Sequence, residues 1–229
     1  NNSGTIAASG GANALLAMGV FNANDGSIFA GGAGSVIRSA GSSAYNGDLT
    51  LSSALRLTGG THVFADGVTL NGTGSVVHDG AVTVTMNDVT ANVPYALTSS
   101  DTLTLAAGKT FTAGSGMTTN STFFAPVTIT GGGTLVIPTA QTLLFNSNDT
   151  QPLYLNNVTV NNAGTFQLNG TTGNNAVQLN SGAVFNNQVG GQILFSQPGN
   201  TFTTGAGTGT LNNSGTIAAS GGANALLAM

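Results

Sequence analysis

The chain has no cysteine, no tryptophan and no glutamate among its 229 residues. Without cysteine it can form no disulfide, thiolate metal site or cysteine nucleophile. Charge is almost as scarce, because Asp, Glu, Lys and Arg make up 4% of the residues, against about 25% in an average globular protein. The seven acids are all aspartates, the bases are Arg38, Arg56 and Lys109, and the net charge is −4.

These shortages exclude several classes of protein. A nucleic-acid surface needs clustered Lys and Arg to neutralise phosphates, and three bases do not supply one. The same scarcity argues against recruitment to an anionic membrane. The chain also contains no run of about 18 apolar residues that could cross a bilayer. We therefore expect no nucleic-acid partner and no membrane insertion of this segment.

Gly, Asn, Thr, Ser and Ala dominate, yet 40% of the residues are apolar and the mean hydropathy is +0.22, so the chain should fold. Apolar residues alternate with Thr, Ser or Gln in short segments, which predicts strands. No stretch shows convincing helical periodicity; ANALLAM at residues 12–18 is the best candidate for a helix, and it is short. The alternating segments include DLTL, AVTVTM, DTLTLA, PVTIT, GTFQL and NAVQL.

A glycine corner, followed by one residue of any kind and then by an apolar residue, recurs along the chain. Short strands and glycine corners at a period of roughly 20 to 30 residues indicate a solenoid. In a parallel β-helix like residues stack about 4.8 Å apart, which disfavours charge and favours ladders of Asn, Thr and Ser. We predict an all-β parallel β-helix of about nine coils. The corners are Gly4, Gly26, Gly47, Gly74, Gly133, Gly164, Gly191 and Gly215.

The first eighteen residues, NNSGTIAASGGANALLAM, recur without a change at residues 212–229. A tandem array explains this repetition: residues 1–211 are one full unit, and residues 212–229 begin the next unit of the same solenoid. A whole number of coils per unit would let copy follow copy without a break. On this interpretation the segment lies inside a longer chain, and any secretion signal or anchor lies outside it.

The segments LNNSGTIAAS, NNVTVNNAGTFQLNGTT and ITGGGTLVI resemble the repeats of large bacterial surface proteins. The nearest families are autotransporter passengers and filamentous-haemagglutinin-like adhesins. The resemblance implies secretion across a Gram-negative envelope, a cell-surface or extracellular location and a right-handed β-helix shaft. It carries over no binding residue, because no site motif is present.

An alternative is a β-helix protein that binds or cleaves polysaccharides. With a 22-residue coil, Asp66 would lie under Asp88 and Asp79 under Asp101, near the roughly 5 Å carboxylate separation of retaining glycosidases. His78 and Lys109 could lie nearby. Against this, Asp66 and Asp79 precede glycines, as turn aspartates do, and Tyr45, Tyr95 and Tyr154 are too scattered to form an aromatic cleft.

Other motifs are weaker. AGKT (Ala107–Thr110) lacks the earlier glycine of a phosphate loop, since Leu103 stands there, and GGAGSVIR (Gly31–Arg38) lacks the aspartate of a calcium-binding β-roll. GAGTG at Gly205 is a corner without dinucleotide-binding spacing. Asn146, Asn148 and Asp149 could help to hold calcium, but a solvated loop is the preferred interpretation. Outward-facing threonines also suggest an ice-binding protein, although the threonine pairs do not recur at every coil.

His62 and His78 are most simply isolated surface residues and not a metal pair. The glycan-acceptor triplets at Asn71, Asn120, Asn157 and Asn169 are expected by chance in so Asn- and Thr-rich a chain. We therefore expect no catalytic, cofactor-binding or metal-binding residue. The expected function is structural: a shaft segment of an extracellular bacterial filament or adhesin stalk. Its partners would be adjacent copies stacked end to end, laterally bundled copies, and a host or surface ligand bound by domains outside this segment.

Because little stability should rest on ion pairs, we predict a melting temperature that depends weakly on salt and on pH between about 5 and 9. Thermal unfolding measured across that range checks this. A shift of tens of degrees would contradict it.

Overall fold

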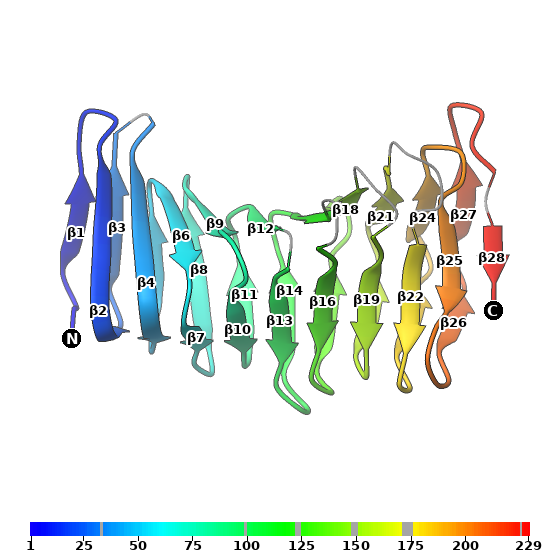
Figure 1. The fold of residues 1–229 in the computed structure, drawn as a ribbon, viewed down its shortest axis with the longest axis horizontal. Coiled ribbons are helices and arrows are strands. Elements are labelled where there is room, and N and C mark those ends of the chain that lie inside the picture. Colours follow the sequence, from blue (N-terminus) through cyan, green and yellow to red (C-terminus); the bar gives the residue numbers. More distant parts are fainter. Residues whose placement is uncertain (33, 99, 122–124, 148–150, 171–175, 225) are drawn as a thin grey trace.

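The computed structural model describes residues 1–229 except 33, 99, 122–124, 148–150, 171–175 and 225. The described residues form 28 strands and no helix, and every strand pair is parallel. The strands lie side by side along a rod, and the two termini lie at its opposite ends (Figure 1). The expected all-β parallel solenoid is confirmed.

Three faces wind around the rod, and the chain visits them in a fixed order. The first face is a ten-stranded sheet. Its strands are β1 (Thr5–Ala8), β3 (Ser27–Gly31), β5 (Leu49–Leu51), β8 (Val68–Gly72), β11 (Val89–Ala91), β14 (Thr110–Ala113), β17 (Thr134–Ile137), β20 (Thr159–Asn162), β23 (Val184–Asn187) and β26 (Thr210–Asn213).

The second and third faces share β2 (Asn13–Ala23) and β4 (Val36–Tyr45), whose first halves lie on the second face and second halves on the third. The second face continues with β6 (Ala54–Thr58), β9 (Ser75–His78), β12 (Tyr95–Leu97), β15 (Met117–Ser121), β18 (Thr142–Ser147), β21 (Thr165–Leu168), β24 (Gln192–Phe195) and β27 (Thr216–Ala219). The third face continues with β7 (Thr61–Phe64), β10 (Thr83–Met86), β13 (Thr102–Leu105), β16 (Val127–Thr130), β19 (Leu153–Asn156), β22 (Ala176–Asn180), β25 (Thr201–Thr204) and β28 (Leu226–Ala228).

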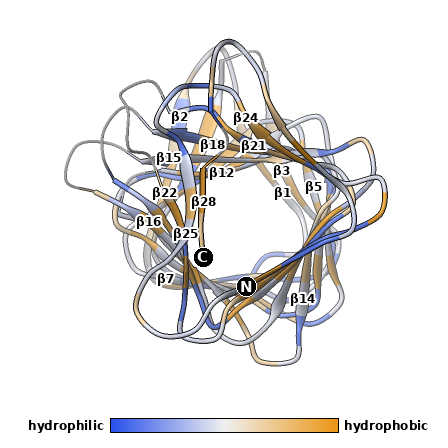
Figure 2. Cartoon of the chain, turned by 90° about the vertical axis from the view of Figure 1, so that its right-hand side faces the viewer, coloured by the Kyte–Doolittle hydropathy of each residue, from blue (hydrophilic) through white to orange (hydrophobic). Residues whose placement is uncertain are grey.

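The alternation in the sequence decides which side chains point inward. In β10 the two threonines face outward while Val84 and Met86 are buried, and most other strands repeat this pattern. A view along the axis shows the strands closing into a ring (Figure 2). Because successive strand residues point to opposite sides, one apolar set lines the interior of every layer.

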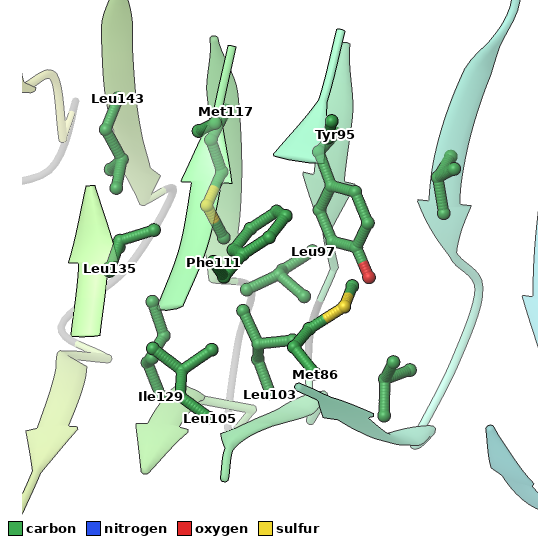
Figure 3. Close-up of a cluster of buried hydrophobic side chains, with 14 of the residues drawn as sticks. Met86, Tyr95, Leu97, Leu103, Leu105, Phe111, Met117, Ile129, Leu135 and Leu143 are labelled. Carbon is green, nitrogen blue, oxygen red and sulfur yellow. The ribbon is translucent and has the colours of Figure 1, made fainter. Parts of the chain in front are cut away.

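Large apolar side chains fill that interior, layer upon layer. Met86, Leu103, Phe111 and Met117 converge from facing strands (Figure 3). Aromatic rings also stack along the axis, with the ring centroids of Tyr45 and Phe64 4.3 Å apart. Such continuous packing removes apolar surface from water, which stabilises the folded state by about 25 cal/mol for each Å² buried.

The length of chain in each layer is not constant. On the second face Val36 pairs with Ala54, whereas Thr165 pairs with Gln192. The second pair is one and a half times as far apart in the sequence as the first. Apart from one register shift between β2 and β4, the strand pairs run in continuous register, so the corners absorb most of the difference. A fixed sequence period therefore predicts stacked pairs only locally.

Residues 12–18, the best candidate for a helix, form none, because Asn13–Ala23 form β2. Gly10 and Gly11 turn the chain with positive φ angles of 61° and 76°, and β2 then pairs with β4 along most of its length. Pairing with a neighbouring strand satisfies the backbone and overrides the helical preference of Ala and Leu.

The expected count of about nine coils is confirmed, but the unit does not close on a whole number of them. Thr5–Ala8 lie on the first face, whereas the identical residues Thr216–Ala219 lie on the second. The 211-residue unit therefore spans nine layers and one additional face. Within the described residues no helix is long and apolar enough to cross a membrane.

Candidate functional site

Four aspartates and one lysine form a column at the corner between the third and first faces. Each carboxylate accepts a backbone N–H from the following layer: Asp25 from Asp48 at 3.1 Å, and Asp48 from Thr69 at 2.7 Å. Asp66 and Asp88 repeat the arrangement with the N–H groups of Asp88 and Thr110. We call Asp25, Asp48, Asp66, Asp88 and Lys109 the charged corner.

Lys109 ends this column and neutralises part of it. Its ammonium lies 3.0 Å from Asp66 and 3.2 Å from Asp88. The carboxylates in turn raise the pKa of Lys109, Asp66 first and then Asp88. The N–H of Thr110 and the Lys109 ammonium lower the pKa of Asp88. The corner thus holds two stacked aspartates bridged by one lysine.

The predicted pairing of Asp66 with Asp88 is confirmed, and Lys109 does lie beside them. A retaining glycosidase needs one carboxyl group that keeps its proton near neutral pH. The lowered pKa of Asp88 is opposite to that requirement, and both side chains are at least half exposed. This geometry supports holding adjacent layers together better than it supports acid–base chemistry.

The predicted stack of Asp79 under Asp101 is wrong. Layers near these residues are short, since Thr83 pairs with Thr102, which is closer to it in sequence than Asp101 is to Asp79. Asp79 instead binds the stacked Arg56 and Arg38, at 3.1 and 3.7 Å. Asp101 lies inside the solenoid.

His62 and His78 are not surface residues: both are fully buried. The Nε2 of His78 lies 2.5 Å from the Tyr95 hydroxyl, and its Nδ1 lies 3.9 Å from Asp101. The His62 Nε2 lies 2.9 Å from the Gly59 carbonyl oxygen. We call His62, His78, Tyr95 and Asp101 the buried polar cluster.

Burial shifts the pKa of every member of this cluster. It lowers the pKa of His78 to about 3, with a smaller contribution from His62, whose own pKa is also lowered. Burial raises the pKa of Tyr95 and that of Asp101, even though Val82 and Thr98 donate backbone N–H groups to the Asp101 carboxylate. The cluster is therefore held in place by hydrogen bonds but resists ionisation.

A histidine, a tyrosine and an aspartate in contact could exchange protons, but access decides whether a substrate can use them. His78, Tyr95 and Asp101 are each at most 1% exposed. In this structure the buried polar cluster can therefore influence stability, whereas a substrate does not reach it.

Asparagine ladders replace charge in the later layers. On the outer side of the first face, Asn186 donates to Asn161 and Asn212 donates to Asn186, both at 2.9 Å. One residue further, a second ladder runs inside the face in the opposite direction. There Asn162 donates to Asn187 at 2.8 Å, and Asn187 donates to Asn213 at 2.7 Å.

The remaining motifs occupy ordinary positions in the solenoid. Asn146 belongs to a ladder between Asn120 and Asn169, whereas Asn148 and Asp149 lie outside the described residues. AGKT forms the corner before β14, where its lysine binds the two aspartates. GAGTG spans the corner between β25 and β26.

Two of the glycan-acceptor triplets begin at Asn71 and Asn157, and the fold places both asparagines. Asn71 accepts a hydrogen bond from Asn92, and Asn157 occupies a corner with a positive φ of 50°. Within the described residues no group of three or more His, Cys, Asp or Glu could hold a metal ion. Tyr154 lies half-buried on β19, away from the buried Tyr45 and Tyr95.

Two shallow grooves lie on the surface. The larger, of about 470 Å³, follows the corner between the first and second faces, and Ser35, Ser53, Thr73 and Gly74 are among its lining residues. The smaller, of about 330 Å³, runs past Pro94, Gly116 and Gln141. In the part of the chain that the structure describes, no charged side chain lines either groove, which leaves them without a strong anchor for an ionic ligand.

Comparison with protein-family models, with curated proteins and with solved structures finds no match. The class that the geometry defines is thus the parallel β-solenoid, characterised by its ladders, its charged corner and its buried polar cluster.

The buried histidine predicts acid sensitivity. The unfolded chain binds a proton at His78 near pH 6.5, whereas the folded chain does so only near pH 3, so stability falls as the pH decreases through this window. At pH 5 His78 alone should lower the free energy of unfolding by about 2 kcal/mol. Asp101 acts in the opposite sense, because its raised pKa favours the folded state most at low pH. Urea unfolding between pH 7 and 4.5 measures the sum.

His78→Gln is the matched control, because glutamine can still reach Tyr95 but does not titrate. Its stability should fall less steeply with acid than that of the parent chain. Parallel curves for the two proteins would contradict the assignment. The scarcity of ion pairs predicts weak pH dependence between about pH 5 and 9, and the buried His78 adds to it a loss of stability between about pH 6.5 and 3.

The ladders give a second prediction. Asn187 is 1% exposed and bonds to Asn162, Asn213 and the Thr216 carbonyl, so Asn187→Ala leaves buried polar groups without partners. We expect a loss of about 2–3 kcal/mol. Asn186→Ala, on the outer side of the same strand, should lose less than about 1 kcal/mol because water can replace its partners. Equal losses in chemical denaturation would refute the buried ladder's role.

Proposed function

We propose that this chain is a structural shaft segment of a long extracellular filament or surface adhesin built from tandem β-solenoid repeats. The observation that carries the proposal is the eighteen-residue segment that occurs at both ends of the described rod. The resemblance to autotransporter passengers and filamentous-haemagglutinin-like adhesins supports the same role and a secreted, cell-surface location in a Gram-negative bacterium.

The state of the two ends also supports this function. At the C-terminal end Leu227 stacks on the buried Phe202 but is itself 40% exposed. At the N-terminal end Ile6 and Leu16 pack on the core and remain partly exposed. Partly exposed apolar side chains at the end of a solenoid favour the addition of another layer.

The mechanical properties follow from the ladders. Backbone hydrogen bonds run from layer to layer, apolar side chains stack inside them, and Asn ladders run parallel to the axis. Bending such a rod would strain many of these bonds together. A stiff spacer that holds a binding domain away from a cell, or that bundles with its neighbours, makes use of this property.

End-to-end association of the purified chain tests the proposal. At rising concentration we expect rods whose lengths are multiples of one chain, measured by negative-stain electron microscopy and sedimentation. Leu227→Asp should abolish this growth because it places a charge on the open apolar layer. Leu226→Asp, on the outward side of the same strand, should leave growth unchanged. A chain that stays monomeric at all concentrations would contradict the proposal.

A further inference from the structure

The two identical segments lie on different faces of the rod. Thr5–Ala8 belong to the first face and pair with β3, whereas Thr216–Ala219 belong to the second and pair with β24. The same displacement holds further along, since Leu15 lies on the second face and its counterpart Leu226 on the third. The second occurrence is therefore moved around the axis by one face.

The segment keeps its own conformation despite this change of place. Gly10 and Gly11 have φ angles of 61° and 76°, and Gly221 and Gly222 have 61° and 77°. In both occurrences an alanine N–H closes the turn onto a serine carbonyl at 3.0 Å. Because the local geometry is the same, one set of residues can build either corner of the rod.

The hydrogen bonds made by the two occurrences are compatible with each other. Asn212 donates to Asn186 in the layer before it, and its counterpart Asn1 accepts from Asn22 in the layer after it, both at 2.9 Å. An Asn at this position can therefore be stacked on both sides at once, continuing the outer ladder across a junction.

The apolar interior is continuous in the same way. Ile217 pairs with Ile193 below it, and its counterpart Ile6 pairs with Phe29 above it. An apolar column would thus pass from Ile193 through the shared isoleucine to Phe29 of the next unit. The outward column passes from Gln192 through the shared threonine to Ile28.

We infer that consecutive copies are related by a screw: each copy is rotated by one face, about 120°, and advanced by about 45 Å along the axis at a layer spacing of about 4.8 Å. Three copies complete one turn. The inference rests on the proposed tandem array and specifies how one copy receives the next.

The rotation has a consequence for charge. All charged residues of the unit except Asp149 lie between residues 25 and 109, and the charged corner occupies one edge of the rod. Without rotation every copy would place its carboxylates along that same edge. With rotation the three edges carry them in turn, so that no edge of a long rod accumulates the negative charge.

Cysteine pairs test the placement in this chain, which has no cysteine of its own. Gln192→Cys with Thr216→Cys should close a disulfide in most molecules, because these residues are register neighbours on the second face. Val184→Cys with Thr216→Cys should close at least tenfold less, because Val184 lies on the first face. Thr165→Cys with Gln192→Cys, one layer earlier, shows that this column permits the bond.

If the Val184–Thr216 pair closed preferentially, Thr216 would lie on the first face, and the inference would be overturned. Failure of the Gln192–Thr216 pair while the Thr165–Gln192 pair closes would overturn it as well. Mass spectrometry of peptides from the oxidised chains identifies which bond has formed.

Helical reconstruction by cryo-electron microscopy tests the screw itself, on a chain of four consecutive 211-residue units. Units related by a rotation of about 120° and an advance of about 45 Å would support the inference. A continuous rod whose units repeat every whole number of layers, about 43 Å, without rotation would overturn the screw and leave the proposed function intact. Separate compact bodies with no continuous rod would overturn both.

Discussion

Every layer of this protein must place each side chain directly above a similar position in the layer below, about one strand spacing away. At that separation two like charges repel by about 1 kcal/mol in water and by several times more where solvent is partly excluded. The composition reflects this constraint, because charge is scarce and most charged side chains have a partner of opposite sign, whereas Asp25 and Asp48 accept backbone N–H groups. Arg38 and Arg56 share Asp79, and Lys109 lies between Asp66 and Asp88. Beyond Lys109 the unit has a single charged residue, and asparagine amides, which donate and accept at once, take over the stacking.

The fold could be predicted because the alternation and the corner glycines are written locally in each strand. The pairing of distant residues was harder to predict than the fold, because it depends on the length of every intervening corner. Asp66 and Asp88 do meet, whereas Asp79 and Asp101, with the same separation in sequence, do not. A shorter layer between β10 and β13 displaces the second pair, and one sequence contains no independent record of where such shortenings fall.

The buried histidines were missed although a signal for them was present. His62 stands two residues before Phe64, and His78 stands two residues after Val76. Since side chains alternate along a strand, each histidine has the inward orientation of its apolar neighbour. Asp101 has the same relation to Leu103. Expecting polar residues on the surface overrode this parity, and the structure shows that parity decides.

The two neighbouring asparagine ladders of the first face have opposite directions, since the outer amides donate toward the N-terminal end and the inner amides donate toward the C-terminal end. Each ladder aligns its amide dipoles along the axis, and a single aligned ladder would build up a macroscopic dipole in proportion to the length of the rod. Side by side, the two dipoles cancel. Each layer that extends both ladders therefore adds little to the total dipole of this face of the rod.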